Sequence, residues 1–168
     1  MRRRLTWLLV IAGAMLAAGF ATLGLAQAPK PGPVEKKIFL VPGNKAWTAT
    51  GIMLRAVDKV TLSAAGKVYF SGAAPQACPG PNGWPRSEYA GTWPDDYNFC
   101  ADPIDSANHA VLLAKVGNAI FPAGASMTFT GKAGVLALGI NDCSLSGTAA
   151  YFYNTGEYSV VVRVERGQ

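Results

Sequence analysis

Hydrophobic residues in this chain recur at every second position, and no stretch after residue 37 shows a convincing 3.6-residue repeat. The last such run is the clearest: Val160, Val162 and Val164 fall on one face of a strand, and Ser159, Arg163 and Glu165 fall on the other. A period of two puts neighbouring side chains on opposite faces of a strand, whereas a helix needs the longer period. The sequence therefore predicts strands, each with one buried face.

Turn residues separate these alternating runs, for example at residues 42–44, 65–67, 122–124 and 131–134. About eight short strands result, with no helix between them. Strands joined by short turns pair antiparallel, and sheets with one apolar face stack on each other. The pattern predicts an all-β chain with a single antiparallel β-sandwich over residues 38–168.

Residues 1–28 have the three parts of an export signal. Arg2, Arg3 and Arg4 precede a long apolar run, and Ala26-Gln27-Ala28 is a small-x-small cleavage pattern. We expect cleavage after Ala28, a secreted or periplasmic product and no membrane attachment afterwards; an uncleaved anchor is the alternative. Residues 29–37 form a Pro-rich lead-in.

The net charge of +5 comes partly from this signal, which holds three of the 15 Lys and Arg. The remaining 12 stand against 10 acidic residues and form no basic patch. Nucleic-acid binding is therefore not expected. A single His in the chain also excludes a His-rich metal site.

Residues 75–108 lack the alternating pattern but contain five large aromatics, a composition unlike that of a disordered loop. A disulfide between Cys78 and Cys100 would close about 22 residues and leave Cys143 free. We expect an ordered, stapled long loop. Its Trp84 and Trp93 either offer a platform for a sugar ring or fill the underside of the loop.

Several motifs together resemble the bacterial galactose-specific, calcium-dependent lectins of the PA-IL type. They are GPNG (80–83), LLAKVGN (112–118), GVLALGIND (134–142) and NTGEYSVVV (154–162). The resemblance extends from about Trp47 to Val164. It implies a jelly-roll sandwich of the galactose-binding-domain-like class, calcium as a cofactor and a glycan, of galactose type or another sugar, as the partner.

The resemblance also implies roles for single residues. Asp142 and Asn154 match calcium ligands of these lectins. Asn141 and Thr155 stand next to them on either side of the same loop, and we expect these four residues to form the metal site. Tyr153 stands where the lectins have a further ligating Asn, which leaves a weakened site. Trp93 and Asp95 correspond to the segment that touches sugar. Because the lectin loops gather at one end of the fold, a Cys78–Cys143 disulfide competes with the pairing given above.

Bland alternatives accompany these expectations. Asp142 and Asn154 are also ordinary turn residues, and His109 is more often structural than catalytic. The acidic group Asp95, Asp96, Asp102 and Asp105 is either a second cation site or a solvated rim. No G-x-S-x-G elbow is present, so we expect no catalysis. The sequence predicts a secreted, calcium-assisted carbohydrate-binding module; the alternative is a structural or protein-interaction β-sandwich of the cell envelope.

Overall fold

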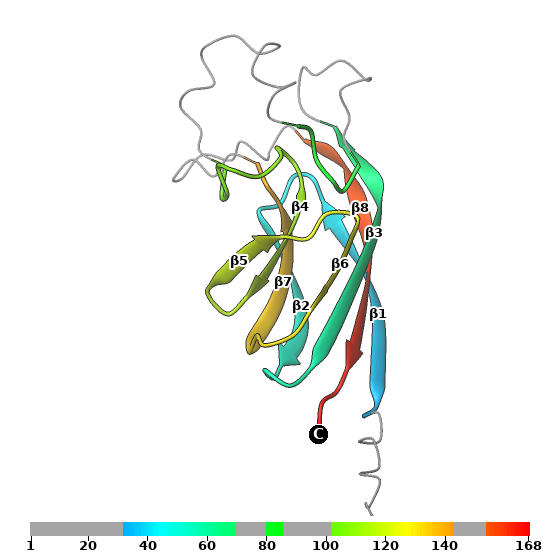
Figure 1. The fold of residues 1–168 in the computed structure, drawn as a ribbon. Coiled ribbons are helices and arrows are strands. Elements are labelled where there is room, and N and C mark those ends of the chain that lie inside the picture. Colours follow the sequence, from blue (N-terminus) through cyan, green and yellow to red (C-terminus); the bar gives the residue numbers. More distant parts are fainter. Residues whose placement is uncertain (1–31, 70–79, 86–101, 143–153) are drawn as a thin grey trace, which may run out of the picture. The chain divides into compact units, whose positions relative to one another are not determined.

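Two four-stranded antiparallel sheets face each other in the computed structural model (Figure 1), which describes residues 32–69, 80–85, 102–142 and 154–168. One sheet has the order β1-β8-β3-β6 and the other the order β2-β7-β4-β5. The first contains β1 (Val34–Pro42), β8 (Thr155–Glu165), β3 (Lys59–Tyr69) and β6 (Ser126–Phe129). The second contains β2 (Trp47–Leu54), β7 (Gly134–Ile140), β4 (Leu112–Val116) and β5 (Ala119–Pro122). This strand order is that of an eight-stranded jelly roll and confirms the predicted fold class.

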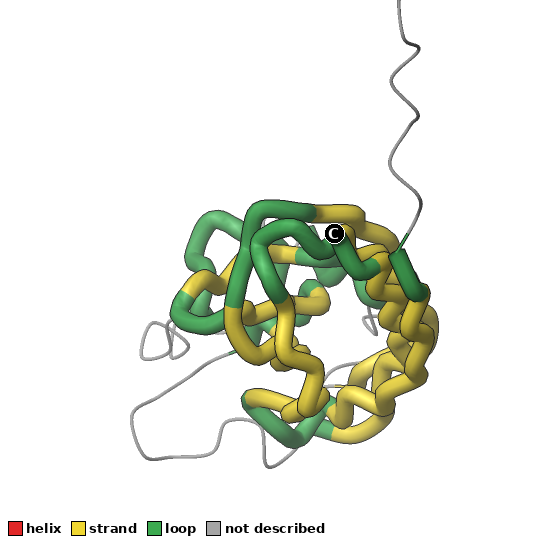
Figure 2. The backbone as a smooth tube through the Cα atoms, turned by 90° about the horizontal axis from the view of Figure 1, so that it is seen from below, coloured by secondary structure: helices red, strands yellow, loops and turns green. Residues whose placement is uncertain are grey.

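The core lies between the two sheets, which Figure 2 shows in a view turned by 90°. In β8, Val160, Val162 and Val164 are fully buried, as their alternation predicts. Leu136 and Leu138 of β7 are fully buried too and belong to the same hydrophobic cluster. The buried faces therefore have the period of two seen in the sequence.

β1 begins at Val34, four residues before the predicted start at Ile38. Residues 34–37, which the sequence assigns to the lead-in of residues 29–37, therefore belong to this strand. They pair with β8, beginning with Val34 opposite Glu165. The alternation fails here because β1 is an edge strand, and both Val34 and Ile38 are exposed. Charged residues are common on such edges, where they discourage pairing with other chains.

β3 runs without a break through Ala65-Gly66-Lys67, where the sequence predicts a turn. Gly66 keeps its pairing with Tyr158 of β8 while adopting a φ of +111°. A Cβ atom at Gly66 would lie 2.3 Å from the carbonyl oxygen of Glu157. Gly66 thus allows two strands to approach closely. In the sequence, such a glycine cannot be told from a turn residue.

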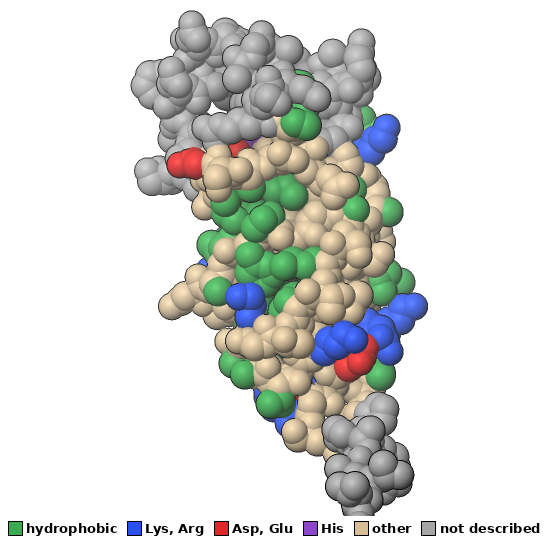
Figure 3. Space-filling view, in the orientation of Figure 1, with side chains coloured by type: hydrophobic (Ala, Val, Ile, Leu, Met, Phe, Trp, Pro, Cys, Tyr) green, Lys and Arg blue, Asp and Glu red, His purple; other side chains and the backbone are tan. Residues whose placement is uncertain are grey.

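Aromatic packing closes one side of the sandwich, between the edge strands β5 and β6. The rings of Phe121 and Phe129 meet edge to face, with centroids 5.1 Å apart and an interplanar angle of 77°. The ammonium of Lys132 lies 4.7 Å from the centre of the Phe121 ring. Hydrophobic side chains are visible on this face of the molecule between the two strands (Figure 3). The side is sealed by side chains because β5 and β6 do not pair.

Asp58 and Arg166 form an ion pair at the end of the sandwich where β1 begins and β8 ends, which is the lower end in Figure 1. Asp58 is 1% exposed and accepts hydrogen bonds from the guanidinium of Arg166, at 2.8 Å, and from that of Arg55, at 3.1 Å. The backbone N–H of Arg166 donates to the carbonyl oxygen of Pro33 at 3.0 Å. Both ends of the domain therefore lie at this end. Among the described residues, no helix is long and apolar enough to cross a membrane.

Candidate functional site

The opposite end of the sandwich carries the polar residues that the sequence singled out. β7 ends at Ile140, and Asn141 and Asp142 follow it directly. Asn154 directly precedes β8. The β1–β2 turn reaches the same place, because Gly43 donates its N–H to the carbonyl oxygen of Gly156 at 3.0 Å. We call this region the site end.

Asp142 and Asn154 meet at the site end, although twelve positions separate them in sequence. The Asn154 Nδ2 donates to Asp142 Oδ2 at 2.5 Å and to the carbonyl oxygen of Gly43 at 3.2 Å. Both Asp142 and Asn154 are 5% exposed. The end of β7 and the start of β8 thus position these two residues. The structure brings together the two residues with the strongest match to ligand positions.

Gly43 was predicted only as a turn residue, yet it supplies the third polar atom of this cluster. A Cβ atom there would lie 2.6 Å from the Val68 side chain and 3.4 Å from the Asn154 Cβ. Only glycine lets the turn come close enough for its carbonyl to reach Asn154. The sequence motif Pro42-Gly43-Asn44 shows a turn, but not that the turn lies against β8.

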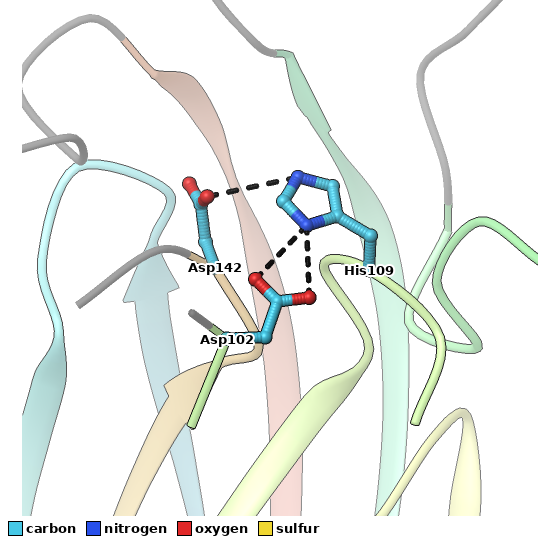
Figure 4. Close-up of side chains that lie close together, drawn as sticks. All are labelled: Asp102, His109 and Asp142. Atoms are coloured by element: carbon cyan, nitrogen blue, oxygen red, sulfur yellow. Dashed lines mark hydrogen bonds and ion pairs between the residues drawn. The ribbon is translucent and has the colours of Figure 1, made fainter. Parts of the chain in front are cut away.

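His109 lies between two carboxylates at the site end (Figure 4). Its Nδ1 is 3.2 Å from both oxygens of Asp102, and its Nε2 is 3.6 Å from Asp142 Oδ1. The side chains of His109, Asp102 and Asp142 are 8%, 13% and 6% exposed. Asp102 is thus no solvated rim residue, and His109 is not isolated. The sequence missed this cluster because the spacing of the three residues follows no local ligand motif.

The backbone around His109 is held from several directions. Trp84 and His109 exchange two backbone hydrogen bonds, of 2.7 and 3.1 Å, which attach the turn of residues 80–85 to this segment. Ala110, a buried residue, has a φ of +58°. Its N–H donates to the carbonyl oxygen of Asn141 at 2.6 Å, and its carbonyl accepts from the Tyr158 hydroxyl at 2.9 Å. These contacts fix the direction in which the His109 side chain leaves the chain.

Tyr158 supports the site from inside the core. Its hydroxyl also lies 3.0 Å from the carbonyl oxygen of Gly80, so it links the turn at Gly80 to Ala110. Burial raises the pKa of this hydroxyl above its usual range. The hydroxyl therefore keeps its proton, and can donate it in a hydrogen bond, at neutral pH.

Asn141 binds the segment before β4. Its Oδ1 accepts from the N–H of Ile104 at 2.9 Å. Its Nδ2 donates to the carbonyl oxygens of Ile104, at 3.0 Å, and Asn108, at 3.1 Å, and lies 3.4 Å from Asp102 Oδ2. The carboxamide thus positions Asp102 and its loop. The carboxamide oxygen of Asn141 accepts from Ile104, whereas the contact with Asn154 is made by the next residue, Asp142.

The other predicted site residues have mixed outcomes. Thr155 is exposed and opens β8, where it pairs with Tyr69. Trp84 is half-buried and reaches the site through its backbone bridge to His109. The remaining predicted residues lie outside the described residues, namely Trp93, Asp95, Tyr153, Cys78 and Cys100.

The chain is similar in structure to a lectin domain of known structure. No family model matches the sequence, and no curated protein matches it. Among solved structures, the chain is similar to the EclA N-terminal domain, described as a PllA-like lectin, with 26% identity and a TM-score of 0.53. The similarity covers 77% of this chain and 95% of that one. The chain therefore has a lectin-like β-sandwich fold.

Proposed function

We propose that this protein binds carbohydrate at the site end with the help of a calcium ion. We propose further that it catalyses no reaction and that it acts outside the cytoplasm. The similarity to nearly the whole length of a lectin domain carries this proposal. A galactose-type sugar is the first candidate, on the sequence resemblance. The export signal that the sequence predicts over residues 1–28 supports the location, and the proposal of calcium rests on the side chains at the site end.

Three oxygen atoms can converge on one ion there. The two ends of a carboxamide have nearly the same shape, so a half-turn of the Asn154 amide would place Oδ1 where Nδ2 now lies. Asp142 Oδ2, Asn154 Oδ1 and the Gly43 carbonyl oxygen would then face one another. Calcium takes six to eight oxygen ligands, including carboxylates, carboxamides and backbone carbonyls. The donor set of these residues therefore fits calcium, and sugar hydroxyls can supply further oxygens.

The expected affinity is low. The cluster offers one carboxylate, and Tyr153 replaces a ligand at the neighbouring position. Sites of low ligand charge bind calcium with dissociation constants of about 10⁻⁴ to 10⁻³ M. At free calcium tenfold above such a constant, bound ion would stabilise the fold by about 1.4 kcal/mol.

Calcium-dependent glycan binding is the test. We expect wild type to melt at a higher temperature in millimolar calcium than in chelator, and to bind sugars on a glycan array only with calcium. Asp142→Asn should lose both responses, because Asp142 supplies the only carboxylate that the described residues bring to this cluster. Glu157→Gln is the matched control, since Glu157 is an exposed acid on the same strand that follows Asn154.

Two outcomes would contradict the proposal. If the melting curves in calcium and in chelator superimpose, the protein does not bind calcium and that part of the proposal is wrong. An array without binding under either condition would remove the sugar and favour a structural or protein-interaction role instead.

A further inference from the structure

We propose that His109, Asp142 and Asp102 form a transition-metal site, with Zn²⁺ as its probe, beside the proposed calcium site. His109 Nε2 and Asp142 Oδ1 are the two ligands, and Asp102 is a positioning residue. The three side chains offer ligand atoms that all lie within 4.8 Å of one another. Imidazole nitrogen favours zinc and its neighbours in the transition series, whereas calcium prefers oxygen alone.

The distance between the two ligand atoms supports this assignment. His109 Nε2 and Asp142 Oδ1 are 3.6 Å apart, which is too long for a hydrogen bond. Two ligands of a tetrahedral zinc ion, each about 2.1 Å from the metal, lie about 3.4 Å apart. The spacing thus suits two ligands of one ion better than a direct bond between them.

Asp102 fixes the orientation and tautomer of the imidazole. Its two oxygens each lie 3.2 Å from His109 Nδ1, so the carboxylate can accept the Nδ1 proton. The Nε2 lone pair then points toward Asp142. A carboxylate behind a ligating histidine is the usual support of a protein-bound metal, and its loss typically costs 10- to 100-fold in affinity.

The surroundings hold this geometry in advance. His109 and Asp142 are more than nine-tenths buried, and Asn141 ties Asp102 to the end of β7. Ala110, next to His109, keeps a left-handed backbone conformation that is unfavourable for a residue other than glycine. Its hydrogen bonds to Asn141 and Tyr158 stabilise this conformation. The scaffold therefore aims the imidazole at Asp142 before any ion arrives.

The two oxygens of Asp142 separate the two proposed ions. Oδ1 faces His109, while Oδ2 faces Asn154. Variants can therefore dissociate the sites. His109→Gln should weaken zinc binding at least tenfold and leave the calcium response unchanged, whereas Asn154→Ala should remove the calcium response and leave zinc binding unchanged. Asp142→Asn should lose both. This inference does not rest on sugar binding, so each proposal can fail by itself.

The experiment is a titration of tag-free, chelator-treated protein with Zn²⁺, followed by calorimetry and melting temperature, and with Co²⁺, followed by its visible absorption. We expect one bound ion per chain, with affinity lowered at least tenfold by His109→Gln. Asp102→Ala should weaken binding 10- to 100-fold, and Asp102→Asn should restore part of it, because its Oδ1 can still accept the Nδ1 proton. Glu157→Gln should bind as wild type does.

Zinc binding of equal strength in wild type and His109→Gln would overturn the proposal, and would point to the cysteines as ligands. So would the absence of a Co²⁺ spectrum in wild type. If His109→Gln fails to fold, the Asp102→Ala and Asp102→Asn pair decides: equal affinities in both variants and wild type would also overturn it.

Discussion

Asp142 shows how much a single residue position can determine. It comes directly after a buried strand, and its two oxygens face two different partners, His109 and Asn154. A turn residue would need neither partner, because Asp in a turn bonds to nearby backbone N–H groups. The structure gives Asp142 side-chain partners from two distant parts of the chain. The sequence match at Asp142 therefore corresponds to a defined set of side-chain neighbours in the structure.

Asp58, at the far end, is a buried carboxylate whose charge the fold stabilises. Burial alone would raise the pKa of its carboxyl. The N–H groups of Arg55 and Gly167 and the guanidinium groups of Arg166 and Arg55 outweigh that effect and hold this pKa well below its usual range. A lowered pKa means that the folded state favours the charged form. The stability from Asp58 is therefore fully present above about pH 4 and is lost as the pH falls further.

We predict that Asp58→Asn lowers the free energy of unfolding by about 2 to 3 kcal/mol at pH 7, because charged hydrogen bonds are lost in a buried place. The gap between variant and wild type should narrow below pH 4. Urea unfolding at pH 7 and pH 3 measures both values. Glu157→Gln, an exposed change of the same charge, should have little effect. A gap that stays constant with pH would contradict the linkage.

At the scale of elements, two glycines in strands show two different reasons for having no side chain. At Gly51 the reason is the backbone conformation alone, and at Gly66 it is also the close approach of a neighbouring strand. Gly51 has a φ of +68°, and a Cβ atom added there would meet no other atom within 4 Å. Gly66 has a φ of +111°, and a Cβ atom there would lie 2.3 Å from the Glu157 carbonyl oxygen. Any other residue would be strained by the left-handed backbone at both positions, but only at Gly66 would it also collide with β8.

We predict that Gly51→Ala costs about 1 kcal/mol of stability, and that Gly66→Ala costs about 3 kcal/mol. Equilibrium unfolding in urea gives both numbers, with Gly51→Ala as the control for backbone strain. Similar losses for the two variants would show that the β3–β8 contact at Gly66 can relax.

The elements themselves were largely predictable, because burial follows the period of two. Val160, Val162 and Val164 show this directly. The edge strand β1 was harder, since Ile38 and Leu40 point to solvent and its charged residues hide the alternation. Gly66 misled for the opposite reason, because a residue that permits a turn also permits two strands to touch.

The site was predictable only where one stretch of sequence carried it. Asp142 and Asn154 flank a single loop, so a motif could indicate them. Asp102 and His109 meet Asp142 only because β4 pairs with β7, with Leu112 opposite Ile140. Gly43 arrives from a third segment. Such contacts depend on the order of strands in the two sheets, and local spacing does not contain that order.

At the scale of the whole molecule, the cysteines give a further prediction. We expect Cys78 and Cys100 to form a disulfide and Cys143 to stay free, since that pairing closes only the long loop. Reduction should then lower stability by about 3 kcal/mol. Peptide mapping without reductant is the measurement. Recovery of a Cys78–Cys143 or Cys100–Cys143 link would contradict the pairing.

The Arg166–Pro33 hydrogen bond has a practical consequence for attachment. It draws both ends of the sandwich domain to the end opposite Asp142 and Asn154. Any linker, neighbouring domain or solid support joined through either end of the sandwich domain would therefore be attached opposite the site end. Immobilised copies would all present the site end outward. If the site end binds sugar as proposed, many weak contacts would then act together on a multivalent surface.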